Sequence, residues 1–203
     1  MCERVLNPAL TDEAQLLQRA RRADLAAFNE LVTAYESLVY NLCYRLLGQR
    51  QAAEDAAQEA FIAAWRGIGG LRGDAFRPWL LRIAANACRD EQRRRARRPT
   101  ASLDVALEAG LPEPADPAPL PEASALQGEL RWRLERALAG LPAEQRLALV
   151  LCDVEGLDYS EIATVMKTSL GTVKSRIARG RGRLRQALAA ERELLPGRFR
   201  PEE

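Results

Sequence analysis

The segment "SLGTVKSRIARGRGRLRQAL", from Ser169 to Leu188, decides how the fold of the whole chain is interpreted. Its apolar residues recur at the spacing of one helix face, at Val173, Ile177 and Leu184. Six cations lie between Lys174 and Arg185 without a single acid, although exposed helices usually carry both signs. This pattern predicts a helix that buries one face and presents the other to an anionic partner.

A short helix is expected directly before this segment. Asp158, followed by Glu161 three residues later, predicts a capping pair at the start of a helix over Tyr159 to Met166. The small Ala163 near its middle permits close, angled packing of the two helices, as in a helix-turn-helix. The second helix of such a unit enters the major groove of DNA.

Hydroxyl and cationic side chains occupy the second helix away from its apolar residues. They suit base edges and phosphates, and we expect these side chains to contact DNA: Thr172, Lys174, Ser175, Arg176, Arg179 and Arg183. The alternative is a basic helix face that contacts only water. We favour DNA because no acid compensates the charge between Lys174 and Ala190.

The composition indicates an all-α protein. The 203 residues are 47% hydrophobic but only 5% aromatic, and stretches rich in Ala, Leu, Arg and Glu outnumber runs of β-branched residues. Helical periodicity predicts four helices in the first half of the chain: one after Thr11, one from Leu25 to Gly48, one over Ala52 to Trp65, and one from Pro78 into an arginine-rich run.

Charge is segregated along the chain although the formal net charge is only +2. Residues 89–98 hold six arginines, whereas residues 99–129 hold six acids and no cation. Six prolines between Pro99 and Pro121 predict an extended acidic linker over 99–128. We therefore expect two small helical domains, 11–98 and 129–190, with an N-terminal tail over 1–10 and a C-terminal tail over 191–203.

The sequence offers no constellation for catalysis or for a metal. It contains no histidine, its four cysteines form no CxxC pair, and GxSxG, HExxH and Walker-type motifs are absent. We expect no cofactor, no metal and no enzymatic activity. The first residues, "MCERVLNPALTDEAQ", lack the apolar core of a signal peptide, and no apolar run reaches membrane-spanning length, so a cytoplasmic protein is expected.

Three blocks of sequence together resemble one bacterial family. "AEDAAQEAFIAAW" (Ala53 to Trp65) and "WLLRIAANACRDEQRRR" (Trp79 to Arg95) resemble region 2 of the extracytoplasmic-function (ECF) sigma factors, within the sigma-70 family of RNA polymerase subunits. "LPAEQRLALVLCDVEGLDYSEIA" with "GTVKSRIARGR" resembles region 4 of the same family. The resemblance implies a subunit that binds core RNA polymerase, directs it to promoters through minus-ten and minus-thirty-five elements, and assists initiation.

A polar stripe on the third predicted helix is the candidate site for core polymerase. Its members share a helix face at i, i+3, i+4 and i+7: Asp55, Gln58, Glu59 and Ile62. The resemblance implies that this stripe binds the clamp helices of the largest polymerase subunit, and that region 4 meets the polymerase flap. Asp55 could instead only stabilise the N-terminus of its own helix.

A basic stripe on the fourth predicted helix is the candidate site for the minus-ten element. Its members lie at i, i+4, i+7 and i+11: Arg82, Asn86, Arg89 and Arg93. The resemblance implies that the Gly-rich loop from Gly67 to Phe76, together with Asn86, captures an unstacked promoter base. It also implies an anti-sigma factor as a regulatory partner, and a linker that threads the channels of the polymerase.

Two alternatives remain open at the level of sequence. A stand-alone helix-turn-helix regulator would need only the C-terminal domain and would leave residues 53–65 without a role. An enzyme acting on nucleic acid would need a nucleophile or a metal site, which the sequence does not provide.

Three residues of the predicted helix-turn-helix are unusual for their positions: a lysine where glycine is expected, and two glycines inside a helix. Lys167 stands where a left-handed residue is expected after the first helix, at a cost of about 1 kcal/mol. Gly180 and Gly182 lie inside the second helix, where each weakens it by up to about 1 kcal/mol.

Overall fold

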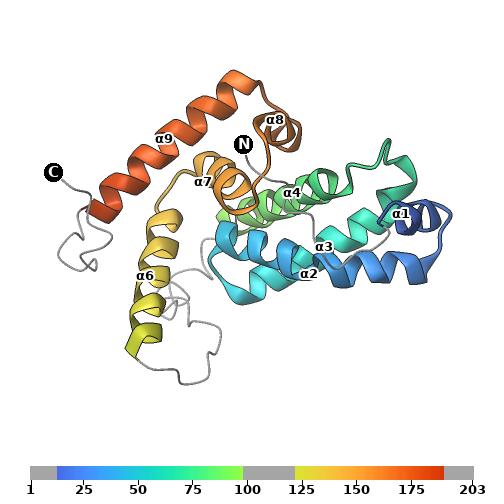
Figure 1. Cartoon of the computed structure of the whole chain (residues 1–203), viewed down its shortest axis with the longest axis horizontal. Coiled ribbons are helices and arrows are strands. Elements are labelled where there is room, and N and C mark those ends of the chain that lie inside the picture. The colour runs from blue at the N-terminus through green and yellow to red at the C-terminus, as the bar shows by residue number, and fades with distance from the viewer. Residues whose placement is uncertain (1–12, 98–121, 190–203) are drawn as a thin grey trace.

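The computed structural model of the chain describes residues 13–97 and 122–189. All the regular elements in these two ranges are helices, which confirms the all-α fold (Figure 1). The two predicted tails and most of the predicted linker, with all of its acidic residues except Glu122, lie outside the described residues. No helix in the part of the chain that the structure describes is long and apolar enough to span a membrane.

The N-terminal domain is a helical bundle. Its elements are α1 (Glu13–Arg21), α2 (Leu25–Leu47), α3 (Arg50–Gly67), the short 3-10 helix η1 (Ile68–Gly70) and α4 (Phe76–Ala96). Asp24 caps α2 by accepting a hydrogen bond from the backbone N of Ala27 at 3.1 Å. Gly48 ends α2 in the left-handed conformation, with φ of 72°, and the chain turns directly into α3.

Small residues on α3 allow the three long helices to approach closely. The buried face of α3 is made almost entirely of alanine: Ala52, Ala53, Ala56, Ala57, Ala60 and Ala64. Aromatic rings pack where the start of α2, the end of α3 and the start of α4 meet, with Phe28 against Trp65 at 5.0 Å and Tyr35 against Phe76 at 5.3 Å between ring centroids. Trp65 and Phe61 pack against the core.

The C-terminal domain contains the predicted helix-turn-helix. Its elements are α6 (Glu122–Ala139), α7 (Ala143–Leu149), a π-helical turn η3 (Val150–Val154), α8 (Tyr159–Met166) and α9 (Leu170–Ala189). The sequence predicted an extended linker up to residue 128, but α6 already begins at Glu122. The reason is local: no proline follows Pro121 in this segment, and Ala, Leu, Gln and Glu favour a helix.

The two domains lie against each other. Helix α8 packs on α4, and α7 and α6 pack on α2 (Figure 1). One hydrophobic cluster of buried side chains therefore includes residues of both domains. Cys43 and Cys88 are buried in the N-terminal part of this core, whereas Cys152 is only partly buried. Cys43 and Cys88 therefore serve as small core residues.

Candidate nucleic-acid and polymerase interfaces

The turn between α8 and α9 positions the candidate recognition helix. Asp158 accepts hydrogen bonds from the backbone N of Ser160 and of Glu161, both at 2.8 Å, and the Glu161 carboxylate accepts one from Asp158 N. This is the predicted capping box. Lys167 ends α8 with φ of 51°, so the chain uses the left-handed conformation with a lysine rather than with a glycine.

One face of α9 is buried against α7 and α8. Val173 and Ile177 are almost fully buried there, as the apolar spacing predicted. Gly180 lies on the same face, and a Cβ at this position would meet Leu149 Cδ1 on α7 at 2.7 Å. Helix propensity alone marks Gly180 only as a weak point of the helix, because the approach of α7 is a tertiary feature that propensity does not contain.

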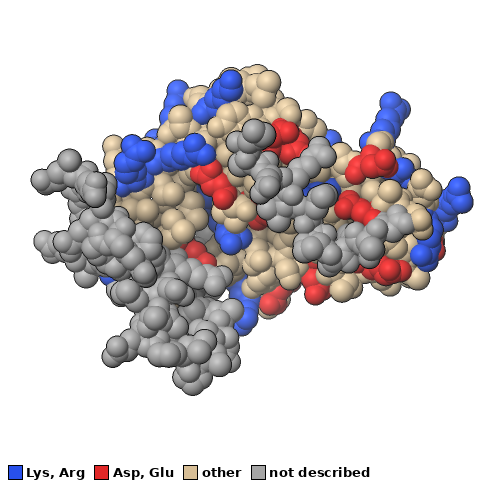
Figure 2. Space-filling model, viewed as in Figure 1, with Lys and Arg blue, Asp and Glu red and all other residues tan. Residues whose placement is uncertain are grey.

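The outer face of α9 carries the cations that the sequence predicted. Lys174, Arg179 and Arg183 are exposed, and Figure 2 shows Lys and Arg side chains projecting along the edge of the molecule that α9 forms. Thr172 and Ser175 are half-buried, and the backbone N of Thr172 donates to Ser169 Oγ at 3.2 Å, which caps the helix. The exposed cations therefore offer a basic surface suited to a DNA backbone.

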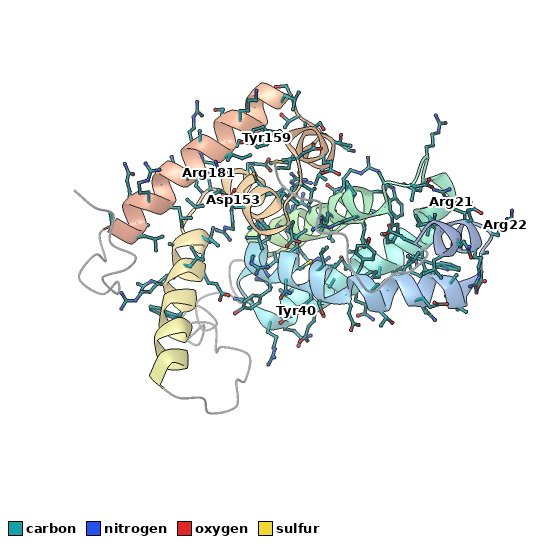
Figure 3. All side chains as sticks on the ribbon, in the orientation of Figure 1. Arg21, Arg22, Tyr40, Asp153, Tyr159 and Arg181 are labelled. Atoms are coloured by element: carbon teal, nitrogen blue, oxygen red, sulfur yellow. The ribbon has the colours of Figure 1, made fainter. Side chains whose placement is uncertain are left out.

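Two arginines of α9 are engaged within the protein. Arg176 is half-buried, and its Nη1 lies 3.0 Å from Glu144 Oε2 without the alignment of a hydrogen bond. In this conformation Arg176 is therefore paired with Glu144 rather than open to a DNA partner. Arg181, which no sequence pattern indicated as a site residue, pairs with Asp153 (Figure 3), where its Nε donates to Oδ2 at 3.1 Å. The hydrogen bond from Arg181 is the main cause that lowers the pKa of Asp153.

Two arginines of the basic stripe on α4 are paired with acids of the protein itself. Asn86 and Arg93 are exposed and Arg82 is half-buried, but Arg93 pairs with Asp90 at 3.3 Å, one turn away. Arg89 Nη1 donates to Asn86 Oδ1 at 3.1 Å, and Arg89 Nε donates to Glu144 Oε1 of the C-terminal domain at 3.3 Å. The structure thus brings the predicted residues to one helix face but turns Arg89 toward the other domain.

The polar stripe of α3 lies on the surface. All four predicted members are exposed, and Ile62 keeps 44% of its accessible surface. Two of them have partners: Gln51 Nε2 donates to Asp55 Oδ1 at 3.2 Å, and Glu59 pairs with Arg94 of α4 at 3.3 Å. Such exposed pairs contribute at most about 1 kcal/mol, so they are readily exchanged for a partner's cations.

A residue of α1 holds the Gly-rich loop before α4. Arg21 donates from Nη2 to the carbonyl O of Gly73 and lies 3.4 Å from Asp74 Oδ1. Gly73 needs its glycine, because its φ is 72°. Nothing in the sequence pattern pointed to Arg21, since the contact joins residues 52 positions apart.

Comparisons with known proteins agree with both halves of the structure. The family model "Sigma-70 region 2" matches residues 31–98, and the model "Sigma-70, region 4" matches residues 131–184. The chain is 41% identical to the RNA polymerase sigma-H factor of Pseudomonas aeruginosa over 181 residues, which span 87% of this chain and 93% of that protein. It is 38% identical to the ECF RNA polymerase sigma-E factor of Escherichia coli K12 over 184 residues, 87% of this chain and 93% of that one.

Two solved structures are similar to most of the chain. CnrH, solved in complex with the cytosolic domain of CnrY, superposes with a TM-score of 0.64 at 25% identity, covering 88% of this chain and 97% of that chain. The sigma factor RpoE of Bartonella quintana, solved with the anti-sigma factor NepR, gives a TM-score of 0.65 at 26% identity, covering 80% of this chain and 96% of that one.

Proposed function

Since the chain belongs to the sigma-70 family of RNA polymerase sigma factors, in its extracytoplasmic-function group, we propose that its two domains divide the work of promoter recognition. The protein binds core RNA polymerase and directs it to promoters as a transcription initiation factor. Its further partner is an anti-sigma factor. We further propose which residues make each contact, where the two domains begin and end, and in which cellular compartment the protein acts.

The domain limits follow the composition and the helices. Residues 11–98 form region 2 and residues 129–190 form region 4, while the linker over 99–128 includes the first turns of α6. The protein acts in the cytoplasm, where the polymerase is, and performs no bond-making chemistry itself.

The α3 stripe of Asp55, Gln58, Glu59 and Ile62 binds core polymerase. This proposal rests on one observation: all four side chains are exposed on a helix that turns its alanine face to the core. A partner with basic and apolar side chains can exchange for the weak pairs now made by Asp55 and Glu59. The clamp helices of the largest polymerase subunit are the partner that the family implies.

The minus-ten element meets α4 and the preceding loop. Arg82, Asn86, Arg89 and Arg93 lie along one face of α4, where guanidinium groups can hold the phosphates of an opened strand. The loop from Gly67 to Phe76, held by Arg21, is placed at the start of the same helix. We propose that it receives an unstacked base, with Asn86 as a polar contact.

The minus-thirty-five element meets α9. Lys174, Arg179 and Arg183 are exposed there and contact DNA directly, with Thr172 and Ser175 beside them. Arg176 joins them once Glu144 releases it. A stand-alone helix-turn-helix regulator, the alternative, would give no role to the exposed α3 stripe or to the region 2 match.

A binding experiment with purified core polymerase tests the division of labour. The double variant Asp55→Ala and Gln58→Ala should bind core polymerase about tenfold more weakly, because a combined loss of about 1.4 kcal/mol from the two contacts changes the affinity tenfold. Glu36→Ala, an exposed acid on α2, is the control for loss of charge. Both variants should bind duplex DNA through α9 as the unaltered protein does. Equal loss of core and DNA binding would contradict the proposal.

Run-off transcription gives the functional readout. Core polymerase with the protein should start at specific sites on genomic fragments, and core polymerase alone should not. Retained DNA binding without any binding to core polymerase would leave the stand-alone regulator instead.

A further inference from the structure

A cavity lies between the last turns of α6 and the C-terminal half of α9, two helices that pack on each other (Figure 1). Its volume is about 250 Å³, and its lining residues are Arg136, Ala137, Gly140, Leu141, Arg183 and Ala187. We call it the α6–α9 cavity. A water molecule takes up roughly 30 Å³ in the liquid, so the cavity has room for a solute group together with its own waters.

Both charged residues of the cavity are arginines. Arg136 and Arg183 are exposed, and neither forms an ion pair with any residue whose side chain the structure describes. Arg183 differs in this respect from Arg176 and Arg181 on the same helix, which both pair with acids. The other side chains of the lining are apolar. The cavity therefore offers hydrogen-bond donors to an anion and contains no acid that would repel one.

Trp132 holds the guanidinium group of Arg136 in place. The Cζ atom of Arg136 lies 5.3 Å from the centroid of the Trp132 ring, one helical turn earlier. Such a cation–π contact orders the side chain before a ligand arrives. The planar guanidinium group then presents N–H donors whose spacing matches two oxygens of a phosphate. Arg136 is thus ordered in advance at the edge of the cavity.

Arg146 compensates for the carbonyl groups at the end of α6. The C-terminal end of a helix carries partial negative charge, which would repel an anion in a cavity formed at that end. Arg146 of α7 donates from Nη2 to the carbonyl O of Ala139 and to that of Leu141, the second at 3.1 Å. Its guanidinium group forms no ion pair among the side chains that the structure describes. Its positive charge therefore favours an anion at this end of α6.

The cavity continues the polar face of α9. Thr172, Arg176, Arg179 and Arg183 follow one another at i, i+4, i+7 and i+11 and so lie along one side of the helix. Arg183 lines the cavity and lies one turn, about 6 Å, beyond Arg179. A DNA backbone that borders the groove entered by α9 is therefore the anion nearest to the cavity, and its phosphates are the groups that arginine pairs bind.

We propose that the α6–α9 cavity binds one phosphodiester group of the promoter backbone, held between Arg136 and Arg183, so that α6 contacts DNA beside the recognition helix. The inference rests on the proposed function, because it takes α9 to bind the minus-thirty-five element. A phosphate contact of this kind fixes the position of the domain on the duplex and does not distinguish one base from another. Arg136 is the new member of the DNA-binding surface.

Three variants separate a phosphate site from a general effect of charge. R136Q removes one of the two guanidinium groups. A187L fills the cavity with an apolar side chain and leaves the charge of the protein unchanged. R185Q is the matched control, because Arg185 is exposed on α9 and does not line the cavity. Circular dichroism verifies that each variant stays folded.

Fluorescence anisotropy measures the binding of holoenzyme, assembled from core polymerase and the full-length chain, to a labelled duplex. The duplex spans the minus-thirty-five element of a start site found by run-off transcription. We expect R136Q and A187L to weaken binding several-fold, by the same factor for duplexes with single base-pair changes. The slope of log affinity against log salt concentration should fall by about 0.9 in each, the value for one phosphate. R185Q should leave the slope unchanged.

A duplex with one phosphate replaced by neutral methylphosphonate, prepared for each position in turn, locates the contact. At one position the replacement should weaken binding by the unaltered protein and by R185Q but have no further effect on R136Q or A187L. Additive losses at every position, or equal losses in R136Q and R185Q, would overturn the cavity as a phosphate site and leave α9 as a DNA-binding helix. If Arg179→Ala also leaves binding to the duplex unchanged, the role proposed for α9 fails, and the cavity site fails with it.

Discussion

Gly180 of α9 lies so close to Leu149 of α7 that a methyl group at position 180 would stand 2.7 Å from Leu149 Cδ1. The carbonyl O of Gln145 would be 3.4 Å away on the same side. The neighbouring Gly182 has nothing within 4 Å of the corresponding position. Gly180 is therefore required for the close packing of the recognition helix on α7. No neighbouring atom requires a glycine at position 182.

Replacement of the two glycines by alanine should have opposite effects on stability. Gly180→Ala should lower the free energy of unfolding by about 1 to 2 kcal/mol, because overpacking outweighs the gain in helix propensity. Gly182→Ala should raise it by up to about 1 kcal/mol. Urea denaturation followed by circular dichroism measures both. Stabilisation by both substitutions would show that α7 and α9 are not packed as closely as described.

Replacement of Lys167 by glycine should stabilise the fold. It holds φ of 51° at the end of α8, and the chain turns there with a hydrogen bond from Thr168 N to Ala163 O at 3.0 Å. Lys167→Gly should raise the free energy of unfolding by about 1 kcal/mol, because the left-handed conformation strains a residue with a Cβ. Thr168→Gly is the control, since its φ is not positive, and it should not stabilise. A loss of stability in Lys167→Gly would mean that the lysine side chain has a role at this turn.

The local features of α8 and α9 could be predicted from the sequence. The bounds of α8, Tyr159–Met166, agree with the prediction because its capping box and its left-handed end are local features. The buried face of α9 was predictable for the same reason, since helical spacing fixes Val173 and Ile177 on one side.

What the sequence could not predict depends on contacts between distant segments. The position of Arg176 is set by Glu144, and Glu144 is in turn set by the packing of α7 near α4. Residue spacing along α9 carries no information about that approach. The early start of α6 is a different case. The sequence shows that no proline follows Pro121 in this segment, but the acidic, proline-rich composition upstream favoured a linker that extends to residue 128.

Arg21 should control the Gly-rich loop without affecting polymerase binding. Arg21→Met keeps the aliphatic stem but loses the donors to the carbonyl of Gly73 and the charge beside Asp74, so amide hydrogen exchange over residues 71–75 should become faster. Open-complex formation should fall several-fold at unchanged core affinity. Arg22→Met is the matched control, since Arg22 is the exposed neighbour at the same helix end (Figure 3). Equal effects of the two variants would show that the loop does not depend on Arg21.

The pair of Asp153 and Arg181 should make stability depend on pH in the acid range. The pKa of Asp153 is lowered below its ordinary value of 3.8, chiefly by the hydrogen bond from Arg181. A lowered pKa means that the pair stabilises the fold above pH 3.8 and that this contribution is lost as the pH falls through the folded-state pKa. Arg181→Gln should thus be less stable than the unaltered protein near neutral pH, and the difference should shrink below pH 4.

Urea denaturation at a series of pH values measures this difference. Arg179→Gln, which removes the same charge from an exposed position on the same helix, is the control and should show no such trend. A stability difference for Arg181→Gln that stays constant into the acid range would contradict the pairing.

Arg179 and Arg181 should also differ in their effects on DNA. Arg179 is exposed on the outer face of α9, whereas Arg181 points back to Asp153. Arg179→Ala should cost about 1 to 3 kcal/mol at one base pair of the minus-thirty-five element and relax the preference there, as expected for a base contact. Arg181→Ala should have a smaller effect, spread over all sequences, because its charge is already neutralised within the protein. Binding to duplexes with single base-pair changes at one salt concentration measures both, and a uniform loss in Arg179→Ala would place Arg179 on a phosphate instead.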